Sequence, residues 1–210
     1  HWFRPAMGIY GGGCIVWIGD SAVPWEAPLF QYDVNRPVRG RLDLRDLTLD
    51  NGFRLRVLRP GYDYEMEFQN PRATVALRFT ATTAPDLTDR RGTSDFFAGH
   101  VDQPGRYSGY VEIEGRRYAI DCCGIRDRSW GPREIGDDVR MGYCHGESEQ
   151  VAFLAFSRPA DNGEEIYKGY LSMDGIRHDV VRGSRQVKHV DGRLSDIAFE
   201  LEDEAGRRLA

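Results

Sequence analysis

Residues 63–69, Asp-Tyr-Glu-Met-Glu-Phe-Gln, and residues 73–81, Ala-Thr-Val-Ala-Leu-Arg-Phe-Thr-Ala, decide the fold class of this chain. In both segments apolar side chains alternate largely with polar or charged ones. Because successive side chains of a strand point to opposite faces, a period of two predicts strands with one buried and one solvated face. The two segments therefore predict neighbouring strands of an antiparallel sheet.

The same alternation recurs at residues 53–57 and 196–202, and no segment carries a helical stripe of apolar residues over three turns. Glycine and asparagine or aspartate tolerate the positive φ of tight hairpins, so dipeptides that contain them are expected to separate the strands. Such turns are expected at Asn51-Gly52, Pro60-Gly61, Pro104-Gly105, Glu114-Gly115, Asn162-Gly163, Asp174-Gly175 and Asp191-Gly192. The sequence predicts an all-β fold, an antiparallel meander closed as a sandwich or barrel.

Two features suggest how the chain divides into domains. The run of residues 151–156, Val-Ala-Phe-Leu-Ala-Phe, is apolar on both faces and predicts a strand that is covered on both sides. Charged residues, glycine and proline interrupt the alternation at residues 126–133. We therefore expect a first domain over residues 1–125 and a second over 126–210, which the chain need not contain in full. Residues 84–98 are predicted to form a longer polar loop.

Composition excludes several classes of protein. A net charge of -5 and a pI near 5.6 argue against nucleic-acid binding, which usually requires a basic face. No apolar run approaches the roughly 20 residues of a membrane span. The four cysteines have no CxxC spacing and predict reduced thiols, hence a cytoplasmic location. The chain begins at His1 without methionine, so an upstream segment could precede it.

The most unusual segment is residues 124–133, which combine three arginines, Asp127 and Trp130. In an extended strand Arg126, Arg128 and Trp130 share one face, whereas Asp127 lies on the other. Two interpretations stay open. The segment is either a structural plug of arginine against tryptophan or a proton-handling site beside an aromatic wall.

Histidines offer further candidates. His145 lies one strand beyond this segment, so hairpin pairing could bring it near Asp127, with Tyr143 on the same strand face. A histidine beside a carboxylate is a natural acid–base pair near neutral pH. Alternatively, His145 and His100 only complete hydrogen bonds in the core. No set of residues with metal-ligand spacing is evident, so no metal and no cofactor are expected.

Two short motifs carry a resemblance to a known family. Residues 100–106, His-Val-Asp-Gln-Pro-Gly-Arg, and residues 124–133 resemble the paired motifs of tandem lipocalin-like proteins. These proteins are related to AttH and to hydroxyneurosporene synthase, a carotenoid 1,2-hydratase, and Diels–Alderase-type cyclases share their double-calycin architecture. The resemblance implies two lipocalin-like barrels or half-barrels around an apolar ligand. In the hydratase group the second motif often reads Asp-His-x-Trp-Gly, whereas this chain has Arg128 in place of that histidine.

The resemblance implies a cofactor-free hydratase, isomerase or cyclase that acts on an apolar, isoprenoid-like or polyketide-like molecule. Asp127 would then be the proton donor or a positioning carboxylate, and His145 the alternative acid. The expected ligand-binding residues are Trp130, Arg126, Arg128, Tyr143 and His100. The alternative is a calycin-like carrier or sensor in which the arginines anchor a ligand carboxylate. A purely structural β protein comes last, and a homodimer is compatible with all three.

Overall fold

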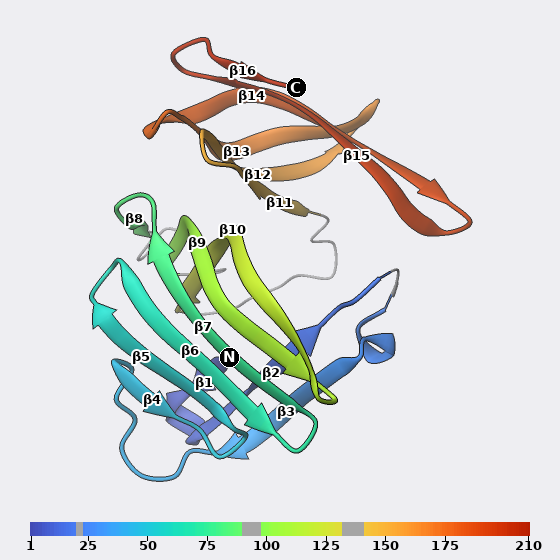
Figure 1. Cartoon of the computed structure of the whole chain (residues 1–210). Helices are drawn as coiled ribbons and strands as arrows, with labels where there is room; N and C mark the ends of the chain where they lie inside the picture. Colours follow the sequence, from blue (N-terminus) through green and yellow to red (C-terminus); the bar gives the residue numbers. More distant parts are fainter. Residues whose placement is uncertain (20–22, 90–97, 132–140) are drawn as a thin grey trace. The chain divides into compact units, whose positions relative to one another are not determined.

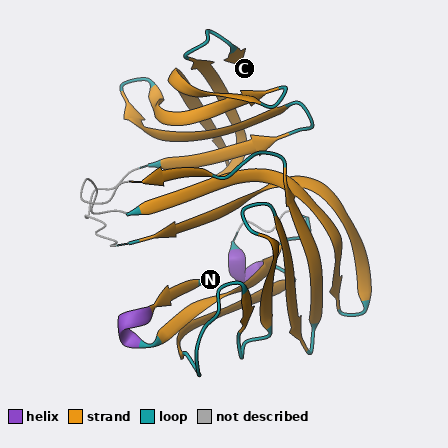
Figure 2. Ribbon diagram, turned by 90° about the vertical axis from the view of Figure 1, so that its left-hand side faces the viewer, coloured by secondary structure: helices purple, strands orange, loops and turns teal. Residues whose placement is uncertain are grey.

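The structure is a computed structural model that describes residues 1–19, 23–89, 98–131 and 141–210. These residues form strands almost throughout, together with two short 3-10 helices, η1 (Pro5–Met7) and η2 (Pro24–Glu26), as Figure 2 shows. The strand pairs are antiparallel. The all-β, antiparallel fold predicted from the sequence is therefore confirmed. Neither of these short helices has the length or apolar character that crossing a membrane requires.

The strands, which are labelled in Figure 1, form three sheets. The first contains β1 (Trp2–Arg4), β2 (Ile9–Val16) and β3 (Leu29–Pro37). The second, in spatial order, contains β10 (Arg116–Trp130), β9 (Gly99–Ile113), β7 (Ala73–Ala81), β6 (Asp63–Asn70), β5 (Phe53–Arg59) and β4 (Asp46–Thr48), with β8 (Asp86–Asp89) paired to β9. The third contains β11 (Gly142–Glu147), β12 (Val151–Ala160), β13 (Gly163–Met173), β14 (Ile176–Val190), β15 (Arg193–Asp203) and β16 (Arg208–Leu209).

The chain divides into two compact units that do not correspond to two continuous segments. The first unit comprises residues 1–80 and 106–122, and the second comprises residues 81–105 and 123–210. Strands β9 and β10 therefore contribute residues to both units. The division into domains at residues 125 and 126 stays a prediction.

The hairpin of β6 and β7 explains why the alternating sequence produces a core in the first unit. Phe68 lies opposite Val75 and Tyr64 lies opposite Phe79, and all four side chains are buried. Burying an aliphatic or aromatic side chain of this size contributes roughly 1.5–3 kcal/mol to folding. Of the polar residues of the alternation, Glu67 and Gln69 are exposed, whereas Asp63 is buried. The period-two pattern thus predicted this hairpin and its buried face correctly.

In three of the expected turns both residues of the dipeptide have a positive φ, a conformation that most residues avoid. Glu114, Asp174 and Asp191 each have φ of 52°, and each is followed by a glycine that also has positive φ. Two successive positive φ values define the type I′ turn, whose twist matches that of the flanking strands. These three hairpin turns are confirmed.

The expectation of a turn at Pro104-Gly105 is wrong, because both residues are buried inside β9. The backbone N–H of Thr82 donates to the carbonyl of Pro104, and the N–H of Gly105 donates to the carboxylate of Glu147. These two hydrogen bonds hold the dipeptide in extended conformation within the strand. Within the predicted loop at residues 84–98, residues 86–89 form β8, and residues 90–97 lie outside the described residues.

Strand β12 of the second unit is covered on both faces, as its apolar sequence predicts. Leu154 and Phe156 pack with Tyr170 on one face, whereas Ala155 packs with Ile166 on the other. The face that carries Phe156 is the one that meets the functional cluster described below.

Candidate functional site

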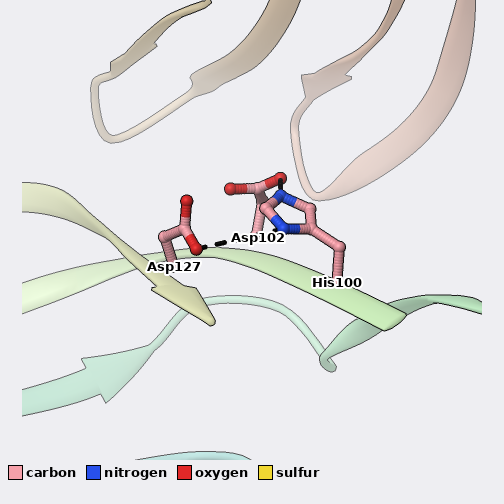
Figure 3. Close-up of side chains that lie close together, drawn as sticks. All are labelled: His100, Asp102 and Asp127. Atoms are coloured by element: carbon pink, nitrogen blue, oxygen red, sulfur yellow. Dashed lines mark hydrogen bonds and ion pairs between the residues drawn. The ribbon is translucent and has the colours of Figure 1, made fainter. Parts of the chain in front are cut away.

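A histidine and an aspartate two residues apart on β9 form the centre of the site. Side chains at positions i and i+2 of a strand share a face, so His100 and Asp102 point the same way. Figure 3 shows the imidazole lying against the carboxylate, with Asp127 of β10 beside them. The Nε2 atom of His100 is 2.5 Å from Oδ2 of Asp102.

This pair is well shielded from water. The side chains of His100 and Asp102 are only 11% and 5% exposed. The second carboxylate oxygen of Asp102 accepts a hydrogen bond of 2.7 Å from the hydroxyl of Tyr143 on β11. Both oxygens of the buried carboxylate therefore have partners, which such a group needs if it is to stay charged.

Asp127 completes the cluster on its more open side. Its Oδ1 lies 4.0 Å from Nδ1 of His100, and its side chain is 46% exposed. Its Oδ2 lies 3.4 Å from the Tyr143 hydroxyl. The two carboxylates thus flank the imidazole, with Asp102 on Nε2 and Asp127 on the Nδ1 side.

Electrostatics favour the protonated form of the imidazole. Burial lowers the pKa of His100, but the hydrogen bond to Asp102 and the negative charges of Asp102 and Asp127 outweigh it. The pKa of His100 is consequently raised above its usual value of 6.5, although the positive charge of Lys168 opposes the rise. Burial, followed by the hydrogen bond and charge of Asp102, raises the pKa of Tyr143, so its hydroxyl keeps its proton.

Strand β11 is held against β9 at two points. Tyr143 donates to Asp102, and Glu147, four residues further on, accepts from the backbone N–H of Gly105 at 3.1 Å. The hydroxyl of Thr82 also donates to Glu147. Burial raises the pKa of Glu147, against the hydrogen bonds that it accepts. These two contacts position the Tyr143 hydroxyl on the buried carboxylate.

An aromatic wall borders the cluster. Across the third sheet, Tyr143 pairs with Phe156, which pairs in turn with Lys168. The ring of Phe156 meets the ring of Tyr143 at 5.2 Å between centroids and that of His100 at 6.4 Å, both edge to face. Tyr170 packs beside Phe156 in the same apolar cluster. The acid–base groups therefore lie next to an apolar surface.

Arg126, Arg128 and Trp130 of the 124–133 segment lie on the face of β10 opposite Asp127. Arg126 donates to Gln103 at 3.4 Å, and the guanidinium of Arg128 lies 5.8 Å from the centroid of the Trp130 ring. Trp130 itself packs on Gly99, where a Cβ atom would come within 2.3 Å of the indole. These contacts confirm the expectation that Asp127 lies on one face of the strand and that Arg126, Arg128 and Trp130 lie on the other.

Binding of a ligand by Arg126, Arg128 and Trp130 stays a prediction, and these side chains face away from His100 and Asp102. Residues 132–133 at the end of the segment lie outside the described residues.

His145 lies at the edge of this arrangement. Its ring is 6.1 Å from that of Tyr143, and the residue is exposed. Among the described residues of β11, it is Tyr143 that contacts Asp127. A catalytic role for His145 stays a prediction, and the histidine beside Asp127 is His100.

Reasoning from the sequence missed Asp102, Phe156 and Lys168. The sequence could have identified Asp102, because a histidine and a carboxylate at positions i and i+2 of a predicted strand share a face. Phe156 and Lys168 had none, because their place opposite Tyr143 depends on the strand register. A shift of one residue in the register would turn them to the other face.

His100, Asp102 and Asp127 are the residues of the cluster that could hold a metal ion, with one ligand atom each within 4.8 Å of the others. Two ligands of one zinc ion lie roughly 3.3 Å apart at normal bond lengths and tetrahedral angles. His100 and Asp102 are 2.5 Å apart, which is the distance of a hydrogen bond. The arrangement therefore fits proton sharing better than joint coordination.

The fold and the cluster define an all-β protein with a buried carboxylate–histidine pair beside an aromatic wall. Residues 13–210 match the family described as "Domain of unknown function (DUF7064)", and the chain belongs to that family. No match was found among the curated proteins or among the solved structures.

Proposed function

We propose that this chain transfers protons to or from an apolar small molecule, as a cofactor-free hydratase, isomerase or cyclase. The observation that carries the proposal is the buried His100–Asp102 pair with Asp127 on the opposite side of the imidazole. Buried acid–base groups with a fixed carboxylate partner are typical of catalytic sites.

In this proposal each nitrogen of His100 has a different role, which is supported by the hydrogen bond to Asp102. A carboxylate only accepts, so Nε2 donates its proton to Asp102, and Nδ1 is the nitrogen that gains or loses a proton. The Tyr143 hydroxyl and the imidazole hold the Asp102 carboxylate from both sides. Asp102 is therefore a positioning residue, and His100 is the acid that delivers a proton from Nδ1.

Asp127 supplies the second group that a hydration needs. In the forward direction, Nδ1 of His100 protonates an alkene carbon, and the resulting carbocation takes up water. The oxygen then loses a proton to Asp127, whose Oδ1 is 4.0 Å from Nδ1 and can return the proton to it. The alkene and water become an alcohol, and both protein groups recover their starting state. Without water, loss of a different proton gives an isomer or a cyclic product.

The resemblance to the carotenoid hydratase group supports the same assignment. That group often has a histidine directly after the motif aspartate, a position that Arg128 occupies here. Arginine cannot exchange protons at neutral pH. In this chain His100 provides an imidazole beside Asp127 from the neighbouring strand. The lipocalin-like relationship is part of this proposal.

The experiment begins with protein purified from its own host, from which native mass spectrometry identifies any bound small molecule. That molecule and a panel of isoprenoids and polyketides are then incubated with the protein in D2O. We expect deuterium to enter the substrate at carbon. Asp127→Asn and His100→Gln should abolish this incorporation while the ligand still binds.

A carrier would give a different result. It would bind the ligand but incorporate no deuterium, and the Asp127 and His100 variants would change only the affinity. The matched control is Glu204→Gln, which removes the carboxylate of a second histidine–carboxylate pair in the same unit, 3.1 Å from His178. This control should leave both binding and incorporation unchanged.

A further inference from the structure

The first sheet has apolar side chains on both faces, and the core of the first unit covers one of them. On this inner face Tyr10 and Leu29 are buried in core clusters. Residues that lie directly opposite each other on neighbouring strands share a face. The outer face of the first sheet therefore carries three such pairs: Trp2 with Gly11, Gly13 with Tyr32, and Ile15 with Phe30.

The outer face is exposed along β3. Phe30, Tyr32 and Val34 alternate along this strand, and they are 42%, 49% and 61% exposed. Trp17, which directly follows β2, is 48% exposed. A contiguous apolar patch on a soluble protein usually marks an interaction site, whereas scattered apolar residues need no explanation. The outer face is such a patch, because its exposed residues lie on one face of one sheet.

The charge of the outer face is positive. Among the residues of its three strands Arg4 is the charged side chain on this face, because it shares the face with Trp2 at position i+2. Its guanidinium lies 5.4 Å from the centroid of the Trp2 ring. Asp33 and Arg36, the charged residues of β3, belong to the inner face by their register. No carboxylate of the three strands therefore shares the outer face with Arg4.

Size and charge argue against a second copy of the chain as the partner. Three strands about 4.8 Å apart and at most nine residues long present roughly 14 Å by 30 Å, or about 400 Å². A stable dimer buries about 800 Å² on each partner. Packing two outer faces together would also place two Arg4 charges in an apolar interface without a carboxylate on either face.

The residue types of the outer face suit a lipid surface instead. Tryptophan and tyrosine prefer the boundary between headgroups and acyl chains, where the ring lies in apolar and its N–H or O–H in polar surroundings. Here the indole N–H of Trp2 donates to the hydroxyl of Tyr32 at 3.0 Å. One arginine near an anionic membrane raises the affinity about fivefold. The net charge of -5 on the whole chain is screened beyond about 8 Å at physiological salt.

From this composition we infer that the outer face of the first sheet binds the surface of an anionic lipid bilayer. Phe30, Tyr32 and Val34 lie at the level of the headgroups, and Arg4 lies beside a lipid phosphate. The contact is peripheral, because the inner face of the same sheet stays in the protein core. The inference does not depend on the proposed function, and its test requires no turnover.

The test measures sedimentation of the protein with sucrose-loaded vesicles at physiological salt. One set of vesicles is phosphatidylcholine alone, and the other also contains phosphatidylglycerol. We expect about fivefold tighter binding to the anionic vesicles, and Arg4→Gln should remove this preference. Val34→Glu places a carboxylate against the headgroups and removes apolar contact, so it should weaken binding to both kinds of vesicle at least tenfold.

Val181→Glu is the matched control, because Val181 is a strand valine of β14 in the second unit and is 59% exposed. It should leave the binding to vesicles unchanged. Circular dichroism and size-exclusion chromatography with light scattering verify that all variants are folded and report the oligomeric state.

Four results would overturn the inference. They are no binding to either kind of vesicle, equal binding to both kinds, equal losses in Val34→Glu and Val181→Glu, and a dimer that Val34→Glu dissociates and that binds no vesicles. The last result would assign the outer face to a second copy of the chain.

Discussion

Two histidine–carboxylate pairs on different strands of the second unit have the same chemistry in different surroundings. His100 and Asp102 share the shielded face of β9 at 2.5 Å, with side chains 11% and 5% exposed. His178 on β14 meets Glu204 in the turn after β15 at 3.1 Å, with side chains 32% and 58% exposed. The residue types alone do not distinguish the two pairs.

The comparison shows that the surroundings of a pair decide what it can do. Water solvates an exposed ion pair and screens its charges, so it contributes little to stability. The buried carboxylate has Tyr143 as a second donor and Asp127 as a neighbouring charge, and both depend on strands from other parts of the sequence. Four experiments test the buried pair, and two of them compare it directly with the exposed one.

The largest difference is expected in catalysis. Asp102→Asn removes the charge that holds and stabilises the imidazolium, so deuterium incorporation should fall by about 10²–10⁴-fold, the usual contribution of a positioned acid or base. NMR titration should also show a lower pKa for His100 in this variant, which a purely structural defect would not produce. Glu204→Gln should retain full incorporation. Equal losses in the two variants would contradict the assignment of His100.

The next difference is expected in stability. Tyr143→Phe leaves one oxygen of the buried Asp102 without its donor, which should lower the free energy of unfolding by about 1–3 kcal/mol. Tyr167→Phe is the control, since Tyr167 is exposed to a similar extent, 46% against 38% for Tyr143, and its hydroxyl has no hydrogen bond among the described residues. Urea unfolding followed by circular dichroism measures both variants. A cost of Tyr167→Phe as large as that of Tyr143→Phe would argue against the buried network.

A smaller difference is expected in the pH dependence of stability. The pKa of His100 is raised in the folded protein, so its contribution is complete below pH 6.5 and is lost as the pH rises through the folded value. Asp102, Asp127 and Lys168 are the charged groups that act on it. His100→Gln should therefore flatten the fall in unfolding free energy above pH 6.5, whereas His178→Gln should leave it in place. An unchanged slope in His100→Gln would show that other groups set the pH dependence.

The smallest effect is expected from metal removal. Because His100 and Asp102 are too close to ligate one ion together, EDTA should leave the thermal midpoint unchanged, and added Zn2+ should not raise it by binding the native state. Differential scanning fluorimetry checks both conditions. A stabilisation by Zn2+ that Asp127→Asn abolishes would establish a metal site at the cluster.

The sequence was sufficient for the local features of the fold. The alternation at residues 63–81 predicted a hairpin and its buried residues, and Asp174-Gly175 predicted a tight turn, because both depend on neighbours in the sequence. Pro104-Gly105 was misread, since its place inside β9 depends on contacts with Thr82 and Glu147.

The site was predictable only in part, for the same reason. Asp127, Tyr143 and His100 were identified as candidates and lie together in the structure. The sequence could not show that β11 brings Tyr143 rather than His145 onto the aspartates, because that depends on how the strand is held. Lys168 became part of the site only through the register of three strands.

Trp130, which packs on Gly99, gives the second unit a tryptophan fluorescence signal of its own. The chain has four tryptophans, and the other three, Trp2, Trp17 and Trp25, belong to the first unit. Trp130 is 42% exposed and lies on the residue that precedes His100. After replacement of the other three by phenylalanine, the remaining emission would come from the second unit alone. Its wavelength would then report a ligand arriving near β9, without an attached dye.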